Sequence, residues 1–244
     1  MKAITERPGS AAARVTCPSC EERTSCFGHG ADASALRQLD QAVERRLSLA
    51  AGEYLYRIGD PFRSLYAVRS GCLKNSFRDE KGRDHVMGFH MPGDVVGVGG
   101  IETQAYIFDL CALEPSGVCE VPFDKLEALA HRVPALRRNI AKIFGRYRNR
   151  DARTQFLRRE DSAEARVAGF LLDFCRRFEE RGRDPASLRL PMSRADIGDY
   201  LGLSAASVGR AFARLGARGI AKVWRRTIKV SSIEGLRSLA AGRA

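Results

Sequence analysis

Three cysteines close to the N-terminus are the residues with the clearest capacity for chemistry. Cys17 and Cys20 are separated by two residues, so a turn between them can direct both sulfurs to one metal. Cys26 follows shortly afterwards and adds a third thiol with little further ordering of the chain. Soft thiolates select zinc or iron–sulfur clusters. We therefore predict a metal site here; the alternative is an irregular tail with three reduced thiols.

The fourth ligand of such a site stays open at this point. His29, three residues after Cys26, would complete a zinc site of three thiolates and one imidazole. A distant cysteine would instead complete an all-thiolate site, suited to zinc or to an iron–sulfur cluster. The distant cysteines are Cys72, Cys111, Cys119 and Cys175.

The composition is that of a globular protein with a basic surface. Of 244 residues, 44% are hydrophobic and 29% are charged, which leaves room for one large domain or two modest ones. Seven cysteines without a secretory or membrane-spanning apolar run predict a soluble cytoplasmic protein with reduced thiols. The net charge of +12 favours a polyanionic partner, with nucleic acid preferred over a membrane.

The chain is predicted to have four parts. Residues 1–30 form the Cys-rich segment, and residues 31–133 form a small β domain. Residues 134–160 form a helix, and residues 161–244 form a second domain. Within the β domain, short β-like runs alternate with turn signals, which indicates an antiparallel barrel, roll or sandwich. The runs are Leu65–Val68, Leu73–Phe77, His85–Phe89 and Asp94–Val98.

The helix over 134–160 carries a coiled-coil seam. Its apolar positions are Leu136, Ile140, Ile143 and Tyr147, at spacings of four, three and four residues. The same register then turns polar, with Asp151 beside it. A polar seam position lowers stability while it sets register, so we predict a dimerisation helix of marginal stability. The alternative is a helix that packs on its own β domain.

Two short helices in the second domain have the spacing of a helix-turn-helix. Ser193 caps the first helix, whose Ile197 and Leu201 point inward, and Gly202 supplies the turn. Ser204 caps the second helix. That helix is predicted to bury Val208, Ala211, Phe212 and Leu215. This pattern predicts a DNA-reading element, the alternative being an ordinary αα-hairpin.

The exposed side chains of the second helix define the predicted DNA contacts. Arg210 is suited to a bidentate contact with guanine, whereas Ser204, Ser207 and Arg214 are suited to phosphates. A hairpin follows, with Arg226 at its basic tip, and is predicted to contact the DNA backbone as a wing. Trp224 beside this tip is predicted to lie in the core.

Four segments carry a resemblance to a known family. They are Ser64–Gly71 (SLYAVRSG), Gly88–Asp94 (GFHMPGD), Cys119–Phe123 (CEVPF) and Asp196–Leu203 (DIGDYLGL). Together with the N-terminal cysteines, the chain resembles the CRP/FNR family of bacterial transcription regulators, in its FNR-like branch (fumarate and nitrate reduction regulators). The likeness covers nearly the whole chain. It implies an α+β fold: an antiparallel β-roll (cupin-like jelly roll) sensor domain, a long dimerisation helix and a C-terminal winged helix-turn-helix.

The resemblance also implies a cofactor and a mechanism. In FNR-like proteins an oxygen-labile [4Fe–4S] cluster is held by three N-terminal cysteines and a fourth that corresponds to Cys119, so the implied ligands are Cys17, Cys20, Cys26 and Cys119. The cluster favours a homodimer that binds a palindromic operator and recruits RNA polymerase for anaerobic or low-oxygen gene expression. Oxygen degrades the cluster and releases monomers. Asp151 matches the acidic position that opposes helix pairing without a cluster, and Ile140, Ile143 and Tyr147 are the implied dimer contacts.

The chain departs from the family pattern in its recognition helix. FNR-like proteins usually present Glu-x-x-Ser-Arg, where this chain has Ala206, Gly209 and Arg210. The operator is therefore predicted to differ from the usual TTGAT half-site. The phosphate cassette of the cyclic-nucleotide branch needs an Arg, and residues 97–110 contain none, so no cyclic nucleotide is expected.

Other functional classes fit the sequence less well. An iron–sulfur electron carrier would need neither the helix-turn-helix nor the net charge of +12. A regulator of the same fold with a zinc site, or with no cluster, would respond to another signal. No nucleophile motif accompanies the scattered histidines, so an enzyme is not expected.

Overall fold

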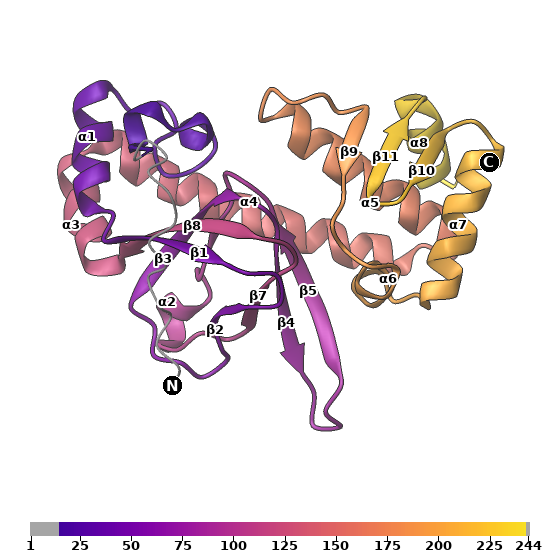
Figure 1. Cartoon of the computed structure of the whole chain (residues 1–244), viewed down its shortest axis with the longest axis horizontal. Helices are drawn as coiled ribbons and strands as arrows, with labels where there is room; N and C mark the ends of the chain where they lie inside the picture. Colours follow the sequence, from indigo (N-terminus) through magenta and orange to yellow (C-terminus); the bar gives the residue numbers. More distant parts are fainter. Residues whose placement is uncertain (1–14, 243–244) are drawn as a thin grey trace. The chain divides into compact units, whose positions relative to one another are not determined.

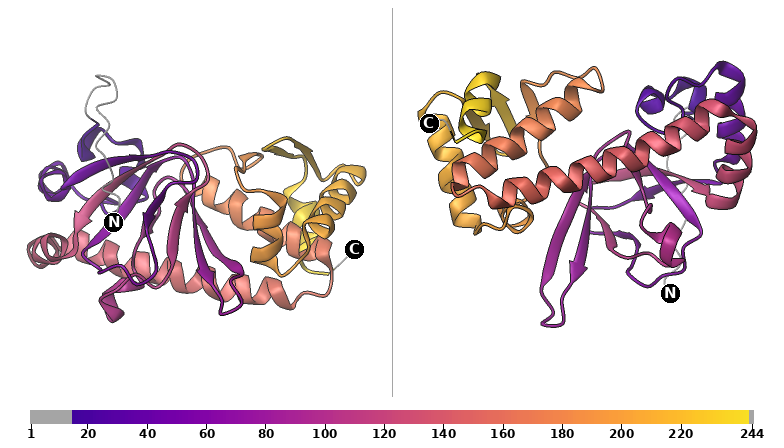
Figure 2. Two further views of the ribbon diagram at one scale, coloured as in Figure 1. Left: turned by 60° about the horizontal axis from the view of Figure 1, so that its bottom comes forward. Right: turned by 180° about the vertical axis from the view of Figure 1, so that it is seen from behind.

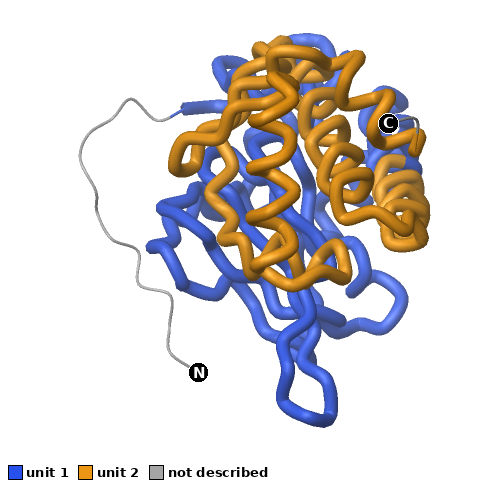
Figure 3. The backbone as a smooth tube through the Cα atoms, turned by 90° about the vertical axis from the view of Figure 1, so that its right-hand side faces the viewer, with its two compact units in different colours: residues 1–145 blue, residues 146–244 orange. Residues whose placement is uncertain are grey.

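The computed structural model describes residues 15–242. Residues 1–14 of the predicted Cys-rich segment, and residues 243–244 of the predicted second domain, lie outside the described residues. The chain divides into two compact units, residues 1–145 and residues 146–244 (Figure 3). Each unit has its own core, and the two are described separately below.

The first unit is a roll of two antiparallel sheets (Figure 1). One sheet has the strand order β1-β8-β3-β6 and the other has the order β2-β7-β4-β5. The strands are β1 (Arg45–Leu49), β2 (Tyr54–Tyr56), β3 (Ser64–Ser70), β4 (Leu73–Arg78), β5 (Asp84–His90), β6 (Val95–Val96), β7 (Asp109–Ala112) and β8 (Ser116–Pro122). The predicted antiparallel β-roll is confirmed, and the four β-like runs fall on β3 to β6.

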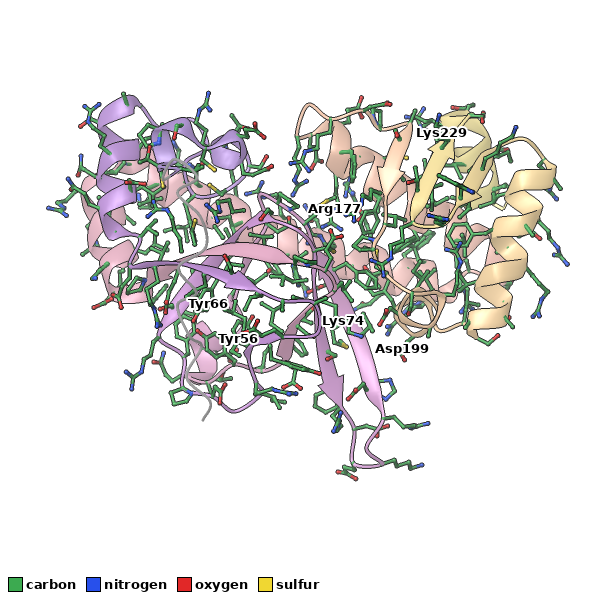
Figure 4. The ribbon with its side chains drawn as sticks, in the orientation of Figure 1. Tyr56, Tyr66, Lys74, Arg177, Asp199 and Lys229 are labelled. Atoms are coloured by element: carbon green, nitrogen blue, oxygen red, sulfur yellow. The ribbon has the colours of Figure 1, made fainter. Side chains whose placement is uncertain are left out.

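Aromatic side chains fill the interior of the roll. The rings of Tyr56 and Tyr106 stack with centroids 3.8 Å apart, and Phe62 meets Tyr106 edge-on. The Tyr106 hydroxyl donates to the Ser64 carbonyl oxygen at 2.8 Å. Figure 4 shows Tyr56 and Tyr66 inside the roll. Buried rings with satisfied hydroxyls stabilise this core without leaving an unpaired polar group.

Helical segments surround the roll. Two one-turn 3-10 helices, η1 (Cys17–Ser19) and η2 (Glu21–Thr24), precede α1 (Ala33–Ala42), which packs against η1 and α3. Asp32 caps α1, because its side chain accepts a hydrogen bond from the Ala35 N–H at 2.8 Å. The remaining helices of this part are α2 (Gly100–Thr103), α3 (Phe123–Arg132) and α4 (Pro134–Arg159).

Helix α4 is one uninterrupted helix of 26 residues (Figure 2). Leu136, Asn139 and Ile143 are buried within the first unit. Ile143 is 4% exposed, so it packs on its own unit instead of facing outward as the seam pattern predicts. Phe144 is 42% exposed. The reason is the helical period: residues 136, 139 and 143 share one face, whereas 140, 144, 147 and 151 share another.

The second unit is a winged helix-turn-helix, as predicted. It contains α5 (Ala163–Glu179), β9 (Ser187–Arg189), α6 (Arg194–Leu201), α7 (Ala205–Ala217), β10 (Ala221–Trp224), β11 (Thr227–Val230) and α8 (Ile233–Ala240). The three strands form a sheet in the order β10-β11-β9. Helix α5 packs against α7 and α8. Its Val167, Phe170, Leu171 and Phe174 are buried. Over residues 15–242, every helix is too short or too polar to cross a membrane.

Candidate metal centre and nucleic-acid interface

Four cysteines line a single cavity in the first unit. Cys17, Cys20 and Cys26 come from the segment around η1 and η2, and Cys119 comes from β8. Cys119 lies in the middle of its sheet, opposite Arg46 of β1 on one side and Ala67 of β3 on the other. The remaining walls are largely apolar, and include Phe27, Leu36, Leu39, Val43, Val68 and Val121. The fold thus brings together thiols that are far apart in the sequence.

Polar contacts fix the cysteine segment from two sides. The Cys17 backbone N–H donates to Asp40 Oδ1 of α1 at 2.7 Å. On the other side, the Asn139 side-chain amide of α4 donates to the Phe27 carbonyl oxygen at 2.9 Å and also to the His29 carbonyl oxygen. Asn139 is 3% exposed. A buried amide held by two carbonyl groups ties the segment directly to α4.

The cavity favours the protonated form of the Cys17, Cys26 and Cys119 thiols. Burial raises the pKa of Cys26 to about 11 and raises the pKa of Cys17 and of Cys119. The Asp40 carboxylate raises the pKa of Cys17 further. Arg46 acts in the opposite direction on the pKa of Cys119, as does Arg69. Thiolates in such surroundings need a cation or a metal to stabilise them.

The other candidate ligands lie elsewhere. His29 is exposed, and its Nδ1 lies 2.5 Å from the Thr24 carbonyl oxygen, away from the cavity lining. Cys72 and Cys111 are buried in the β-roll, and Cys175 is buried in the second unit. Among the distant cysteines, Cys119 is therefore the one that the structure places beside the N-terminal three.

Four cysteine thiols are a donor set that an iron–sulfur cluster uses, and they also suit zinc. Within residues 15–242, no three Cys, His, Asp or Glu side chains are placed to hold one metal ion. A zinc ion needs all of its donors at about 2.0–2.3 Å, whereas a four-iron cluster takes one thiolate per iron and accepts donors that are set further apart. The buried Nε of Arg46, which lines the same cavity, has no hydrogen-bond partner in this part of the chain. A cluster would supply sulfur acceptors there.

The helix-turn-helix is built as its sequence predicts. Ser193 caps α6 through the Asp196 N–H, and Ile197 and Leu201 are buried. Gly202 ends the helix with a positive φ of 67°. A Cβ at Gly198 would lie 2.6 Å from the Leu203 carbonyl oxygen, so the turn can pack this closely only against glycine. The predicted core of α7 is confirmed: Val208, Ala211, Phe212 and Leu215 are buried.

The exposed face of α7 presents two different arginines. The Arg210 Nη2 donates to Ser207 Oγ at 3.0 Å, and Ser204 caps the helix by accepting from the Ser207 N–H. Arg214 forms an ion pair with Glu164 at the start of α5, with Nη1 and Oε1 2.5 Å apart. Arg210 is therefore placed near the helix N-terminus, where base contacts occur, and Arg214 is anchored to the domain.

The wing differs from its prediction at Trp224, which is 72% exposed instead of buried. It is the last residue of β10, directly beside the hairpin tip. Arg225 follows with a positive φ of 54°, and its guanidinium lies over the Trp224 ring, 5.2 Å from the centroid. Arg226 is exposed. The tip thus combines an exposed indole with two cations.

Comparison with known proteins agrees with both units. A cyclic nucleotide-binding domain matches residues 46–133, and a Crp-like helix-turn-helix domain matches residues 165–239. The chain is 35% identical over 227 residues to the transcriptional activator protein anr of Pseudomonas aeruginosa, which covers 93% of both chains. It is 34% identical over 239 residues to the fumarate and nitrate reduction regulatory protein of Salmonella typhimurium, covering 98% of this chain and 96% of the relative. The chain belongs to the CRP/FNR family, in its FNR-like branch.

A solved structure of the family shows the same architecture. FixK2 from Bradyrhizobium japonicum superposes with a TM-score of 0.71 at 29% identity, covering 80% of this chain and 96% of that one. The protein is thus a DNA-binding transcription regulator of the CRP/FNR family. Its β-roll matches the cyclic nucleotide-binding domain in fold, and Tyr106 stacks on Tyr56 inside the roll.

The tight α6–α7 turn of this CRP/FNR regulator gives a stability prediction. Gly198→Ala should destabilise the second unit by about 1–3 kcal/mol, because the new methyl group meets backbone that cannot move aside. Gly209→Ala is the matched change on α7, where nothing lies within 4 Å of a new Cβ. It should stabilise the unit by about 0.5–1 kcal/mol through helix propensity. Thermal unfolding followed by circular dichroism measures both, and equal shifts of the same sign would contradict this packing.

Proposed function

We propose that this protein is an oxygen-responsive transcription regulator that holds a [4Fe–4S] cluster with Cys17, Cys20, Cys26 and Cys119. The observation that carries the proposal is the convergence of these four thiols on one largely apolar cavity. The segment that carries Cys17, Cys20 and Cys26 is hydrogen-bonded to α4. When bound, the cluster supplies an oxygen-labile centre. The protein then acts in the cytoplasm as a homodimer on a palindromic operator, recruits RNA polymerase and responds to no cyclic nucleotide.

Asn139 links the cysteine segment to the dimerisation helix. Its amide holds the carbonyl groups of Phe27 and His29, which follow Cys26 directly in the chain. Any rearrangement of the ligand segment therefore acts on α4 at this residue. Ile140, the next residue along the helix, begins a second stripe with Phe144, Tyr147 and Asp151, which lies beside the buried one.

That stripe is the proposed dimer contact. It consists of Ile140, Phe144, Tyr147 and Asp151, with Phe144 in the place that the sequence pattern gives to Ile143. Partial desolvation raises the pKa of Asp151, while Arg150 and Arg148 act in the opposite direction. Two facing Asp151 carboxylates would repel each other as α4 pairs, which keeps the dimer weak until the ordered cysteine segment supports it.

Near its C-terminus, α4 is bonded to the helix-turn-helix. The Thr154 and Tyr200 hydroxyls lie 2.5 Å apart, and the Arg158 Nε donates to the Tyr200 carbonyl oxygen at 2.9 Å. Tyr200 belongs to α6, the first helix of the DNA-reading pair. Pairing of α4 would thus set the separation of two recognition helices, which must match half-sites about one DNA turn apart.

The DNA contacts divide into reading and positioning residues. Arg210 reads a guanine, whereas Ser204, Ser207, Arg214 and Arg226 position the protein on phosphates. Trp224 and Arg225 extend the contact at the wing tip. Ala206 and Gly209 offer no base-reading groups, so specificity rests mainly on Arg210.

The ligand assignment predicts which cysteines retain iron. Ser substitution of any one of Cys17, Cys20, Cys26 and Cys119 should abolish most cluster binding after anaerobic reconstitution, because one iron of the cluster would lose its thiolate ligand. Substitution of Cys72, Cys111 or Cys175 is the control and should leave the iron content unchanged. Loss of iron with Cys111→Ser but not with Cys119→Ser would overturn the assignment.

The role of Asn139 predicts a variant that separates sensing from dimerisation. Asn139→Leu keeps the volume but removes both hydrogen bonds, so the protein should still bind iron while pairing no longer follows the cluster. Sedimentation velocity with and without iron measures this. Asn149→Leu, at an exposed position on the same helix, is the control. A dimer that forms and dissociates with iron as in the parent protein would contradict the link.

The residues of the recognition helix predict weak base discrimination at every half-site position except the guanine that Arg210 contacts. Arg210→Ala should remove the preference for that base, a loss of about 1–3 kcal/mol. Arg226→Ala should weaken binding to all duplexes alike and lower the salt slope by about 1. Ala206→Glu with Gly209→Ser should narrow the selected half-site towards TTGAT. Selection from random duplexes tests all three variants, and a tightly specified TTGAT site for the parent protein would refute the interpretation.

A further inference from the structure

Arg46 lies directly beside the proposed cluster site. It is opposite Cys119 in the register of β1 and β8, so the two side chains leave the same face of the sheet as neighbours. Its side chain is 15% exposed and lines the cavity of the four cysteines. Burying a charge is costly unless the charge is paired, so a guanidinium in a largely apolar cavity requires hydrogen-bond or ion-pair partners.

One end of this guanidinium is fixed. Nη2 lies 2.5 Å from Asp40 Oδ1, and the same oxygen accepts the Cys17 N–H at 2.7 Å. Asp40 therefore holds Arg46 and the first cysteine in one arrangement. Because a guanidinium is planar and rigid, fixing Nη2 also restricts where the Nε–H can point.

The Nε of Arg46 is without a partner. This atom is buried, and it makes no hydrogen bond within the described residues. An unmade hydrogen bond of a buried charged group is unfavourable and calls for an explanation. The neighbouring thiols are weak acceptors, but a thiolate is a good one. Arg23 and Arg69 also line the cavity, as does Glu22.

We propose that Arg46 is a positioning residue of the iron–sulfur site, whose Nε–H donates a hydrogen bond to the Cys119 sulfur once that sulfur is a thiolate ligand. The inference rests on the proposed function. A hydrogen bond to a ligand sulfur and a nearby positive charge both stabilise the more negative, reduced state of a cluster. Arg46 therefore raises the reduction potential and slows loss of iron.

Three variants of the full chain separate the hydrogen bond from the charge. Arg46→Lys keeps the charge and the pairing with Asp40 but removes the Nε–H. Arg46→Met removes both. Arg78→Met is the control, because it removes an exposed cation of the same unit that pairs with Asp84 outside the cavity.

Two measurements on the anaerobically reconstituted proteins test the proposal. The first is the midpoint potential of one-electron reduction, which a merely structural role would not shift. The midpoint potential should be highest in the parent protein, lower in Arg46→Lys and lowest in Arg46→Met, and Arg78→Met should have the same potential as the parent. The second is anaerobic release of iron to a ferrous chelator, which should be about tenfold faster in Arg46→Met, a difference of about 1.4 kcal/mol in activation free energy.

The outcomes distinguish this inference from the proposed function. A parent protein that binds no iron–sulfur cluster defeats the proposed function itself. If the parent protein binds the cluster, but the Arg46 variants have the same midpoint potential and the same rate of iron release as the parent, the role of Arg46 alone is overturned. If the variants do not bind a cluster, the proposal is tested in the isotopically labelled parent protein by hydrogen exchange of the Arg46 Nε–H. Exchange at least tenfold slower with the cluster than without it supports the bond, and unchanged exchange overturns it.

Discussion

The antiparallel pairing of β8 with β1 and β3 is the constraint on which the sensor site depends. Its register places Cys119 opposite Arg46 and beside Ala67, beneath the segment that carries the other three cysteines. Backbone hydrogen bonds of a central strand leave little freedom, so Cys119 is a fixed point. The N-terminal cysteines reach it because Asp40 and Asn139 hold their segment from two helices.

Helix α4 makes different contacts along its length and on its different faces. One face, with Leu136, Asn139 and Ile143, is buried in the first unit, and the other leaves Phe144 exposed. Towards the end of the helix, Thr154 and Arg158 contact Tyr200 of the helix-turn-helix. Because α4 has contacts of its own within each unit, we propose that pairing of this helix is the route by which the cysteine segment acts on the helix-turn-helix.

Local sequence signals predicted much of this structure. The caps at Ser193 and Ser204, the glycine turn at Gly202 and the apolar spacing of α7 are local, so the helix-turn-helix followed from them directly. The position of Cys119 did not, because strand register is a long-range property; only the family resemblance pointed to it. Trp224 was misplaced for a related reason, and the seam pattern left open which face of α4 is buried against its own unit. Helical spacing does not show which of two adjacent apolar stripes packs against the protein's own core. Local sequence likewise does not show that the end of a strand, such as Trp224 of β10, is exposed to solvent.

The partnerless Nε of Arg46 was also beyond the sequence, which shows a basic residue after Arg45 and nothing more. Its meaning depends on Asp40, on Cys119 and on burial, all of which arise from tertiary structure. The same holds for Asn139, whose amide is functional only because two carbonyl groups face it.

The central claim, that the four-thiol cavity holds a four-iron cluster, is tested most directly by analysis of protein purified without air. We expect a brown solution that absorbs near ~400 nm and contains about four iron atoms and four sulfide ions per chain. Colourless protein that carries about one zinc per chain, and no sulfide, would contradict it.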